Sequence, residues 1–254
     1  GPQHHFFGYI GQCRTIPWNA SGRYVLALRT KFQVRMPVGS EVADVVLLDA
    51  HRNYSEQQVD RTRAWNFQQG TMFYWNPTAA ETQFFFNDRD PATNDIFTVL
   101  FDTALGDAAG KSRGGRLREY RFDDTPVANS GVAPSGERFA AINYARLARL
   151  RPVTGYPDAR DWTAGVAHPQ DDGVFVVDIV SGQKRLIASF AQLANAIRPT
   201  RPEIDGIELF INHTLWSPDG KRLFFFCRGK FGNRTQRINI GFVVRPDGSE
   251  LTML

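Results

Sequence analysis

A turn motif that recurs along the chain limits its fold more than any other feature. Residues 17–26 read PWNASGRYVL, and the motif returns in outline at 133–139 and 216–225, with a degenerate copy at 75–85. In each copy a Pro and a small or acidic residue interrupt an apolar run, and an aromatic or β-branched run follows at once. Pro presets φ at a turn, and Asp-Gly supplies the positive φ that tight hairpins need. The motif therefore predicts four hairpins.

A second repeated element follows each turn. Apolar runs that lead into polar turns occur at 45–49, 98–102, 174–178 and 241–245. Each unit then contains four antiparallel strands, which is the pattern of a β-propeller whose blades bury their faces against one another. We expect an all-β fold with four four-stranded blades, near 8–60, 61–121, 122–188 and 207–254.

The alternative to a propeller is a β-sandwich, which also uses short strands and turns, but four matched turn copies favour the propeller. Most propellers close with more than four blades. We therefore expect part of a larger, seven-bladed ring rather than a closed four-bladed one. The two end blades would then be covered by further blades, by an oligomer or by a partner chain. One short helix is expected at 189–197, and long loops at 104–116 and 145–172.

Composition excludes several classes of protein. The chain is 42% hydrophobic, which is enough for a packed core, yet no run of about eighteen apolar residues predicts a membrane span. The formal charge is +4 and the Arg residues are spread along the chain, so nucleic-acid binding is not expected. The opening residues do not resemble a signal peptide. Cys13 and Cys227 lack the spacing of zinc or redox sites and are interpreted as structural thiols.

Polar residues that precede the turns are the candidates for a site, because the innermost strand of each blade lines the central channel. We expect these residues to converge at one mouth of the channel, Tyr144 and Arg146 from a strand of blade three and the others from the remaining blades. The candidate substrate-binding residues are His5, Arg63, Trp65, Gln68, Gln69 and Asn212, and the candidate catalytic residues are Tyr144, Arg146 and His213.

These residue types suit an anionic sugar. The C5 proton of a uronate becomes acidic only when its carboxylate is neutralised, so a lyase needs Arg or a metal beside the carboxylate, together with a base and an acid. Arg146, His213 and Tyr144 fit these three roles. Structural alternatives remain open: Asn212 and His213 could be a buried polar pair, Trp65 and Tyr144 core aromatics, and Arg146 a surface residue.

Several longer strings resemble a known family. HFFGY at 5–9, TRAWNFQQGTM at 62–72, NYAR at 143–146 and NHTLWSPDG at 212–220 are similar to bacterial propeller proteins related to oligogalacturonate lyases and ulvan lyases, with TolB-like turn repeats. The resemblance implies a seven-bladed propeller, of which this chain covers about the first four blades. It also implies β-elimination at a uronic acid, assisted by His, Tyr and Arg and in some members by a divalent metal held by His and Gln. A periplasmic or secreted location is implied as well. The chain has only five His, so a His cluster for a metal is not assembled in it.

Two function hypotheses follow from these residues. One is a carbohydrate-active propeller that cleaves acidic oligo- or polysaccharides as a lyase. The other is a non-catalytic propeller that binds a carbohydrate or a protein. A glycoside hydrolase would need two carboxylates about 5 to 10 Å apart, and the available acids, Asp88, Asp90, Asp171 and Asp172, occupy turn positions that favour capping.

Overall fold

The computed structural model describes residues 3–8, 15–106, 114–230, 232–233 and 235–254. Its strands form four four-stranded antiparallel sheets, each built from consecutive strands, which confirms the predicted all-β fold with four four-stranded blades. Blade one contains β1 (His4–Phe6), β2 (Tyr24–Thr30), β3 (Ala43–Asp49) and β4 (Ser55–Thr62). Blade two contains β5 (Tyr74–Trp75), β6 (Gln83–Arg89), β7 (Ile96–Asp102) and β8 (Gly115–Tyr120). Blade three contains β9 (Ala128–Val132), β10 (Arg138–Ile142), β11 (Gly173–Asp178) and β12 (Lys184–Ser189). Blade four contains β13 (Leu209–Trp216), β14 (Leu223–Gly229), β15 (Ile238–Val244) and β16 (Thr252–Met253).

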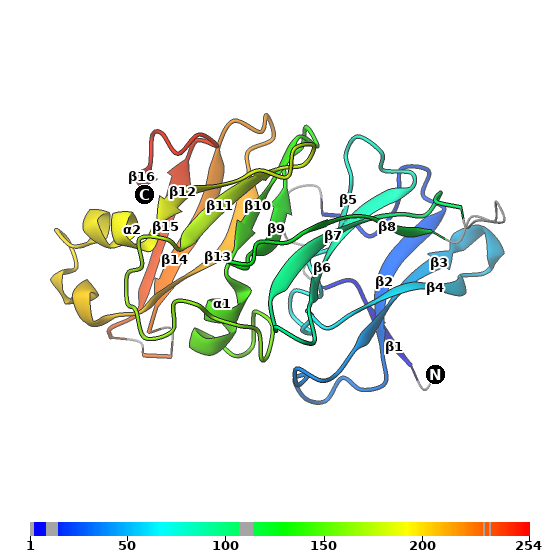
Figure 1. Ribbon diagram of the computed structural model, residues 1–254, viewed down its shortest axis with the longest axis horizontal. Coiled ribbons are helices and arrows are strands. Elements are labelled where there is room, and N and C mark those ends of the chain that lie inside the picture. Colours follow the sequence, from blue (N-terminus) through cyan, green and yellow to red (C-terminus); the bar gives the residue numbers. More distant parts are fainter. Residues whose placement is uncertain (1–2, 9–14, 107–113, 231, 234) are drawn as a thin grey trace.

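The blades follow one another along the longest dimension of the molecule (Figure 1). Blade one lies at the end that carries the N-terminus, and blade four at the end that carries the C-terminus. The expectation that these two end blades are covered by further blades, an oligomer or a partner chain stays a prediction.

The predicted hairpin turns share one backbone geometry. Gly22, Gly136 and Gly220 end the turns of blades one, three and four with φ of 71°, 71° and 70°. The amide of each donates to the carbonyl oxygen three residues earlier, at 2.9–3.0 Å. A residue with a Cβ is disfavoured at such φ, so Gly recurs there. The degenerate copy at 75–85 contains no Gly.

The core is formed where blade faces meet. Successive side chains of a strand point to opposite faces, and β6 shows the effect clearly. Phe84 and Phe86 pack in the cluster shared with blade one, whereas Phe85 packs in the cluster shared with blades three and four. All three are fully buried. Blade two is therefore held on both faces by apolar contact.

Two indole rings link neighbouring blades through hydrogen bonds to backbone carbonyl oxygens. Trp75 donates through Nε1 to the carbonyl oxygen of Pro17 in blade one at 3.0 Å, and Trp216 donates to that of Gly131 in blade three at 2.8 Å. Both rings are at most 8% exposed, whereas Trp18, in the turn motif of blade one, is 37% exposed. Each of the three Trp residues pairs with the strand that follows its turn, so their positions are equivalent, and Trp18 differs from the other two in its exposure.

The helical content differs in part from the expectation. α2 (Phe190–Ile197) confirms the predicted helix, and its Ser189 cap and Gln192 form a capping box. The prediction that Tyr144 and Arg146 lie on a strand is wrong. The strand β10 ends at Ile142, and both residues lie in α1 (Tyr144–Leu150). The Asn143 side chain accepts from the amide of Arg146 at 2.9 Å, and residues 144–150 are mostly strong helix formers.

Two short 3-10 helices complete the secondary structure, η1 (Ala50–Arg52) and η2 (Pro202–Gly206). Among the described residues, none of the helices has both the length and the apolar character that a membrane span needs.

Candidate functional site

A bulge in the inner strand of blade four carries His213. The pairing of β13 with β14 shifts register between Asn212 and Leu215, and His213 has φ of 56°. A non-Gly residue in this region is strained, and such strain often accompanies functional sites. The ring is partly buried and lies edge-on to Phe226, with 6.3 Å between ring centroids. The bulge thus presents an imidazole that a regular strand would orient differently.

Two guanidinium groups act on His213. Burial, followed by the positive charges of Arg228 and Arg151, lowers the pKa of His213 from 6.5 to about 4. Arg228 is held in place, since its Nε donates to Asn239 Oδ1 at 2.8 Å and its guanidinium lies 4.7 Å from the ring centroid of Phe226. At neutral pH the imidazole is therefore uncharged and lies in a positive field, an environment that favours an anionic ligand.

Gln69 lies in the segment between blades one and two, and its side chain contacts β13. Its Nε2 donates to Asn212 Oδ1 at 3.2 Å, and the same oxygen accepts from the amide of His213 at 2.9 Å. Gln69 Oε1 and Asn212 Nδ2 are buried, and neither has a hydrogen-bond partner within the described part of the chain. Buried amide atoms normally have partners. One acceptor and one donor are therefore available beside His213.

A tight turn positions Gln69. The Oδ1 atom of Asn66 accepts from the amides of Gln68 at 2.9 Å and Gln69 at 2.7 Å, and Asn66 Nδ2 donates to the carbonyl oxygen of Gly155 at 2.8 Å. Gly70 follows with φ of 61°, and a Cβ there would lie 2.5 Å from the carbonyl oxygen of Phe7. The turn is thus fixed against both the segment that follows β1 and the connection that follows α1.

Tyr144 and Arg146 lie inside the protein. The hydroxyl of Tyr144 donates to the carbonyl oxygen of Asn129 at 3.1 Å, and its ring stacks on Tyr156 with 4.5 Å between centroids. Burial raises the pKa of Tyr144 well above its usual value. The guanidinium of Arg146 donates to the carbonyl oxygens of Leu209, Thr163 at 3.2 Å and Ala167 at 2.8 Å. Their catalytic assignment stays a prediction, and in this arrangement both side chains are occupied by backbone partners.

The other candidates are spread over several surroundings. His5 is exposed and pairs with Glu56 on blade one. Trp65 is 1% exposed in the core, where its Nε1 donates to the carbonyl oxygen of Glu41 at 2.9 Å. Gln68 is exposed beside the tight turn, and Arg63 lines a separate cavity. Their role in substrate binding stays a prediction, and among the named candidates the structure brings together Gln69, Asn212 and His213.

Arg228 is the residue of this site that sequence reasoning missed. It closes the otherwise apolar run LFFFCR at 223–228. An Arg at the end of a buried strand needs a partner or a function, so this interruption was the available signal. Cys227 beside it is buried, and burial raises the pKa of its thiol, consistent with a structural role. Cys13 lies outside the described residues.

A divalent metal does not fit these residues. Among the described residues, no group of three or more His, Cys, Asp or Glu side chains could hold a metal ion. The charges nearest to His213 are those of Arg228 and Arg151, which repel a cation. The metal that the family resemblance implies in some members therefore has no set of ligands around His213 and Gln69.

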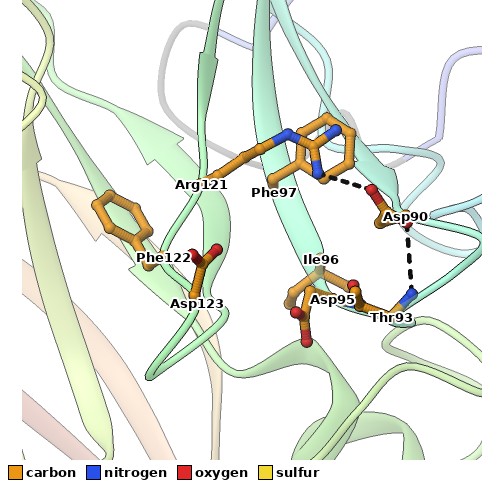
Figure 2. A pocket seen from close by; sticks show the side chains of 8 residues that line it. All are labelled: Asp90, Thr93, Asp95, Ile96, Phe97, Arg121, Phe122 and Asp123. Carbon is orange, nitrogen blue, oxygen red and sulfur yellow. Dashed lines mark hydrogen bonds and ion pairs between the residues drawn. The ribbon is translucent and has the colours of Figure 1, made fainter.

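Three of the four acids considered for a hydrolase are engaged elsewhere, and the fourth, Asp171, is exposed. Asp88 accepts from Arg116 at 2.8 Å, and Asp90 pairs with Arg121 at 3.0 Å. Asp90, Arg121 and Phe97 line a cavity of about 270 Å³ (Figure 2), where the Arg121 guanidinium lies 3.6 Å from the ring centroid of Phe97. Asp172 is fully buried and accepts from Asn143 at 2.9 Å. These three acids have partners that explain them without catalysis.

Comparison with known proteins supports the fold. No family model and no curated protein matches the chain. Among solved structures, it is similar to a putative TolB from Agrobacterium tumefaciens, with a TM-score of 0.50 and 16% identity over 95% of this chain and 61% of that one. It is also similar to hydrazine synthase from Kuenenia stuttgartiensis, with a TM-score of 0.46 and 13% identity over 97% of this chain and 69% of that one. A third is an oligogalacturonate lyase in complex with manganese, with a TM-score of 0.41 and 12% identity over 99% of this chain and 66% of that one.

The first of these likenesses bears on architecture alone. The chain spans 61% of the length of the TolB structure, so the activity of a whole protein is not transferred by it. Identity of this order does not establish a lyase family. The chain has a propeller-like fold, similar to that of the TolB structure and built from four antiparallel four-stranded blades.

Proposed function

We propose that this protein binds an acidic oligosaccharide, with a uronate carboxylate held at the bulge of β13. The observation that carries the proposal is the uncharged imidazole of His213 in the field of Arg228 and Arg151. A carboxylate placed there gains two cationic partners. The free amide atoms of Gln69 and Asn212 can bond to sugar hydroxyls, since one accepts and the other donates.

The same arrangement supports β-elimination. With the uronate carboxylate neutralised by Arg, an uncharged His213 can take the C5 proton, the electron pair forms the C4–C5 double bond, and the C4–oxygen bond breaks. The departing oxygen then needs a proton. Tyr144 is the candidate acid, and its hydroxyl must leave the carbonyl oxygen of Asn129 to serve. The bound carboxylate would also raise the pKa of His213 toward the range in which a base is effective.

A non-catalytic binder is the second candidate, and a specific observation favours it. Both Tyr144 and Arg146 are buried and bonded to backbone carbonyl groups. A site that lacks an accessible acid can still hold an acidic sugar. The two candidates share the binding step and differ only in the bond-breaking step.

One experiment separates them. Oligogalacturonides are incubated with the protein, their binding is measured by calorimetry, and the unsaturated product is followed by its ultraviolet absorbance. Arg228→Gln should weaken binding at least about tenfold, because a charge-assisted pair is lost. Arg222→Gln, an exposed Arg of the same blade that pairs with Glu250, is the matched control.

The outcomes are distinct. Binding together with product formation that depends on His213 supports a lyase, and binding without product supports the non-catalytic protein. Binding that is equal in wild type and Arg228→Gln, or absent altogether, contradicts the proposal.

A further inference from the structure

A second cavity opens where loops of three blades meet. Its volume is about 540 Å³, within the range of small-molecule sites. The contributing segments are the β2–β3 loop, the segment that follows β4, the end of β6 with the hairpin after it, and the connection between α1 and β11. The lining residues are Gly39, Ser40, Arg63, Arg89, Pro91, Asn94 and Asp158.

Arg89 is the buried cation of this cavity. It is 4% exposed, and its two terminal nitrogens donate to Asn94 Oδ1 and to the carbonyl oxygen of Gly39. Its Nε is buried and has no hydrogen-bond partner among the residues that the structure describes. Burial lowers the pKa of this guanidinium, and the charge of Arg63 acts in the same direction, whereas the charges of Asp158 and Asp88 raise it. A buried cation with an unused donor needs an acceptor to offset its desolvation.

Arg63 adds a second, more accessible cation. Its backbone amide donates to Asp88 Oδ1 at 2.8 Å, while its guanidinium has no hydrogen bond or ion pair with any described residue. Asp158 is the one acid in the lining, and its Oδ2 already accepts from the amide of Gly39 at 3.0 Å. The lining therefore carries more positive than negative charge, and one guanidinium is unused.

The cavity in Figure 2 shows the contrast. There Asp90 lies against Arg121. Asp95 pairs with Arg160, and the third acid of that lining is Asp123, so acids outnumber cations in it. The lining at Arg63 and Arg89 has the opposite balance, with two cations and one acid, Asp158. An anion from solution would supply the missing negative charge.

We propose that the cavity between Arg63 and Arg89 is a second anion site, which binds the carboxylate of a small ligand. Guanidinium groups bind carboxylates through paired N–H donors, and Arg63 can offer such a pair while Arg89 adds its positive charge. The ligand class is a small carboxylic acid, either a sugar acid or a simpler carboxylate. The site does not rest on His213, so it stands or falls separately from the function proposed above.

Calorimetry and NMR titration with D-glucuronate test this site, with D-glucose as the neutral control and acetate as the bare carboxylate. The wild type should bind glucuronate and not glucose, and the Arg89 Nε–Hε resonance should shift on binding. Acetate binding with the same dependence on Arg63 identifies the carboxylate alone as the ligand. Binding of glucuronate but not acetate identifies a sugar acid, and both results support an anion site.

Matched variants locate the binding. Arg63→Gln should raise the Kd for glucuronate at least about tenfold. Arg61→Gln should not, because Arg61 is an exposed neighbour that pairs with Asp44 outside the cavity. Arg89→Lys is the second variant, since it loses the hydrogen bonds to Gly39 and Asn94 that hold the positive charge at the cavity, and it should also weaken binding. Arg228→Gln should leave this Kd unchanged.

Three results would overturn the proposal. They are equal binding of glucuronate and glucose, no binding of either carboxylate, and wild-type affinity in both Arg63→Gln and Arg89→Lys. Loss of this binding in Arg228→Gln would instead assign it to the site beside His213 and likewise remove the second site.

Discussion

Gln69 and Asn212 are separated by 143 positions in the sequence, yet their side-chain amides are joined by a hydrogen bond of 3.2 Å. Gln69 comes from the segment that leads into blade two, and Asn212 from the inner strand of blade four. The contact brings both residues beside His213, where each keeps one buried polar atom without a partner in the described structure. It therefore defines where the predicted inner-strand residues converge.

The turn that carries Gln69 is expected to depend on Gly70. Gly70→Ala places a Cβ 2.5 Å from the carbonyl oxygen of Phe7 and adds a disfavoured φ, so it should lower the free energy of unfolding by more than about 1 kcal/mol and weaken ligand binding. Gly22→Ala is the control, because it has a similar φ and no heavy atom within 4 Å of the added Cβ. Denaturant unfolding of the two variants makes the comparison. Equal losses would show that the contact with Phe7 is unimportant.

Substitution of Arg146 should mainly affect stability. Arg146→Lys cannot reach the three carbonyl groups that the guanidinium bonds, and one or more would be left buried without a donor. We expect a loss of about 1–3 kcal/mol in the free energy of unfolding. Arg149→Lys, on the same helix, keeps its charge next to Asp161 and should lose less. Lost activity in Arg146→Lys with unchanged stability would instead support the catalytic role predicted from the sequence.

The indole hydrogen bonds between blades should contribute to stability. Trp216→Phe keeps most of the ring but leaves the buried carbonyl oxygen of Gly131 without its donor, at a cost of about 1–3 kcal/mol. Trp75→Phe removes the equivalent bond to Pro17, whose carbonyl oxygen still accepts from the Leu26 amide at 2.9 Å, so the cost should be at the lower end of this range. Thermal or denaturant unfolding measures both. A near-zero change in both variants would argue against a shared role for the two indoles.

The low pKa of His213 predicts a pH dependence of stability. Between about pH 4 and 6.5 the unfolded chain protonates this His and the folded chain does not, so stability falls as the pH falls. The slope is at most about 1.4 kcal/mol per pH unit. Asp172 has the opposite effect on stability. Burial raises its pKa to about 6, so the folded state binds this proton more tightly than the unfolded chain, and its contribution to stability rises as the pH falls.

A comparison of wild type with His213→Gln cancels the contribution of Asp172. The variant should lose less stability than the wild type between pH 7 and pH 5 when both are unfolded by urea. Parallel curves would mean that the pKa of His213 is not lowered.

The sequence predicted the elements that depend on local signals. The Pro-turns, the following strands and the capped helix after Ser189 all rest on residues close together in the chain. It did not predict α1, because the aromatic and Arg residues at 144–146 also suit a strand and the Asn143 cap was not recognised. Local propensity therefore did not distinguish a helix from a strand at these residues.

The candidate site was also predicted only in part, and the reason differs from that for α1. Gln69, Asn212 and His213 were chosen as inner-strand residues, and their proximity follows from how the blades pack. The burial of Arg146 and the placement of Arg228 near His213 depend on helix packing and strand register, which a single sequence does not specify. The bulge that orients His213 also has no clear signal in the sequence.

The most direct test of the account is the pKa of His213, followed by NMR of its imidazole protons with and without a saturating trigalacturonate. The free protein should show a pKa of about 4, because burial and the charges of Arg228 and Arg151 disfavour the imidazolium. The bound carboxylate should offset those charges, so the pKa should rise on binding, and the rise should be smaller in Arg228→Gln. A pKa near 6.5 in the free protein, or a value that does not change when the ligand is bound, would contradict an acidic-sugar site at His213.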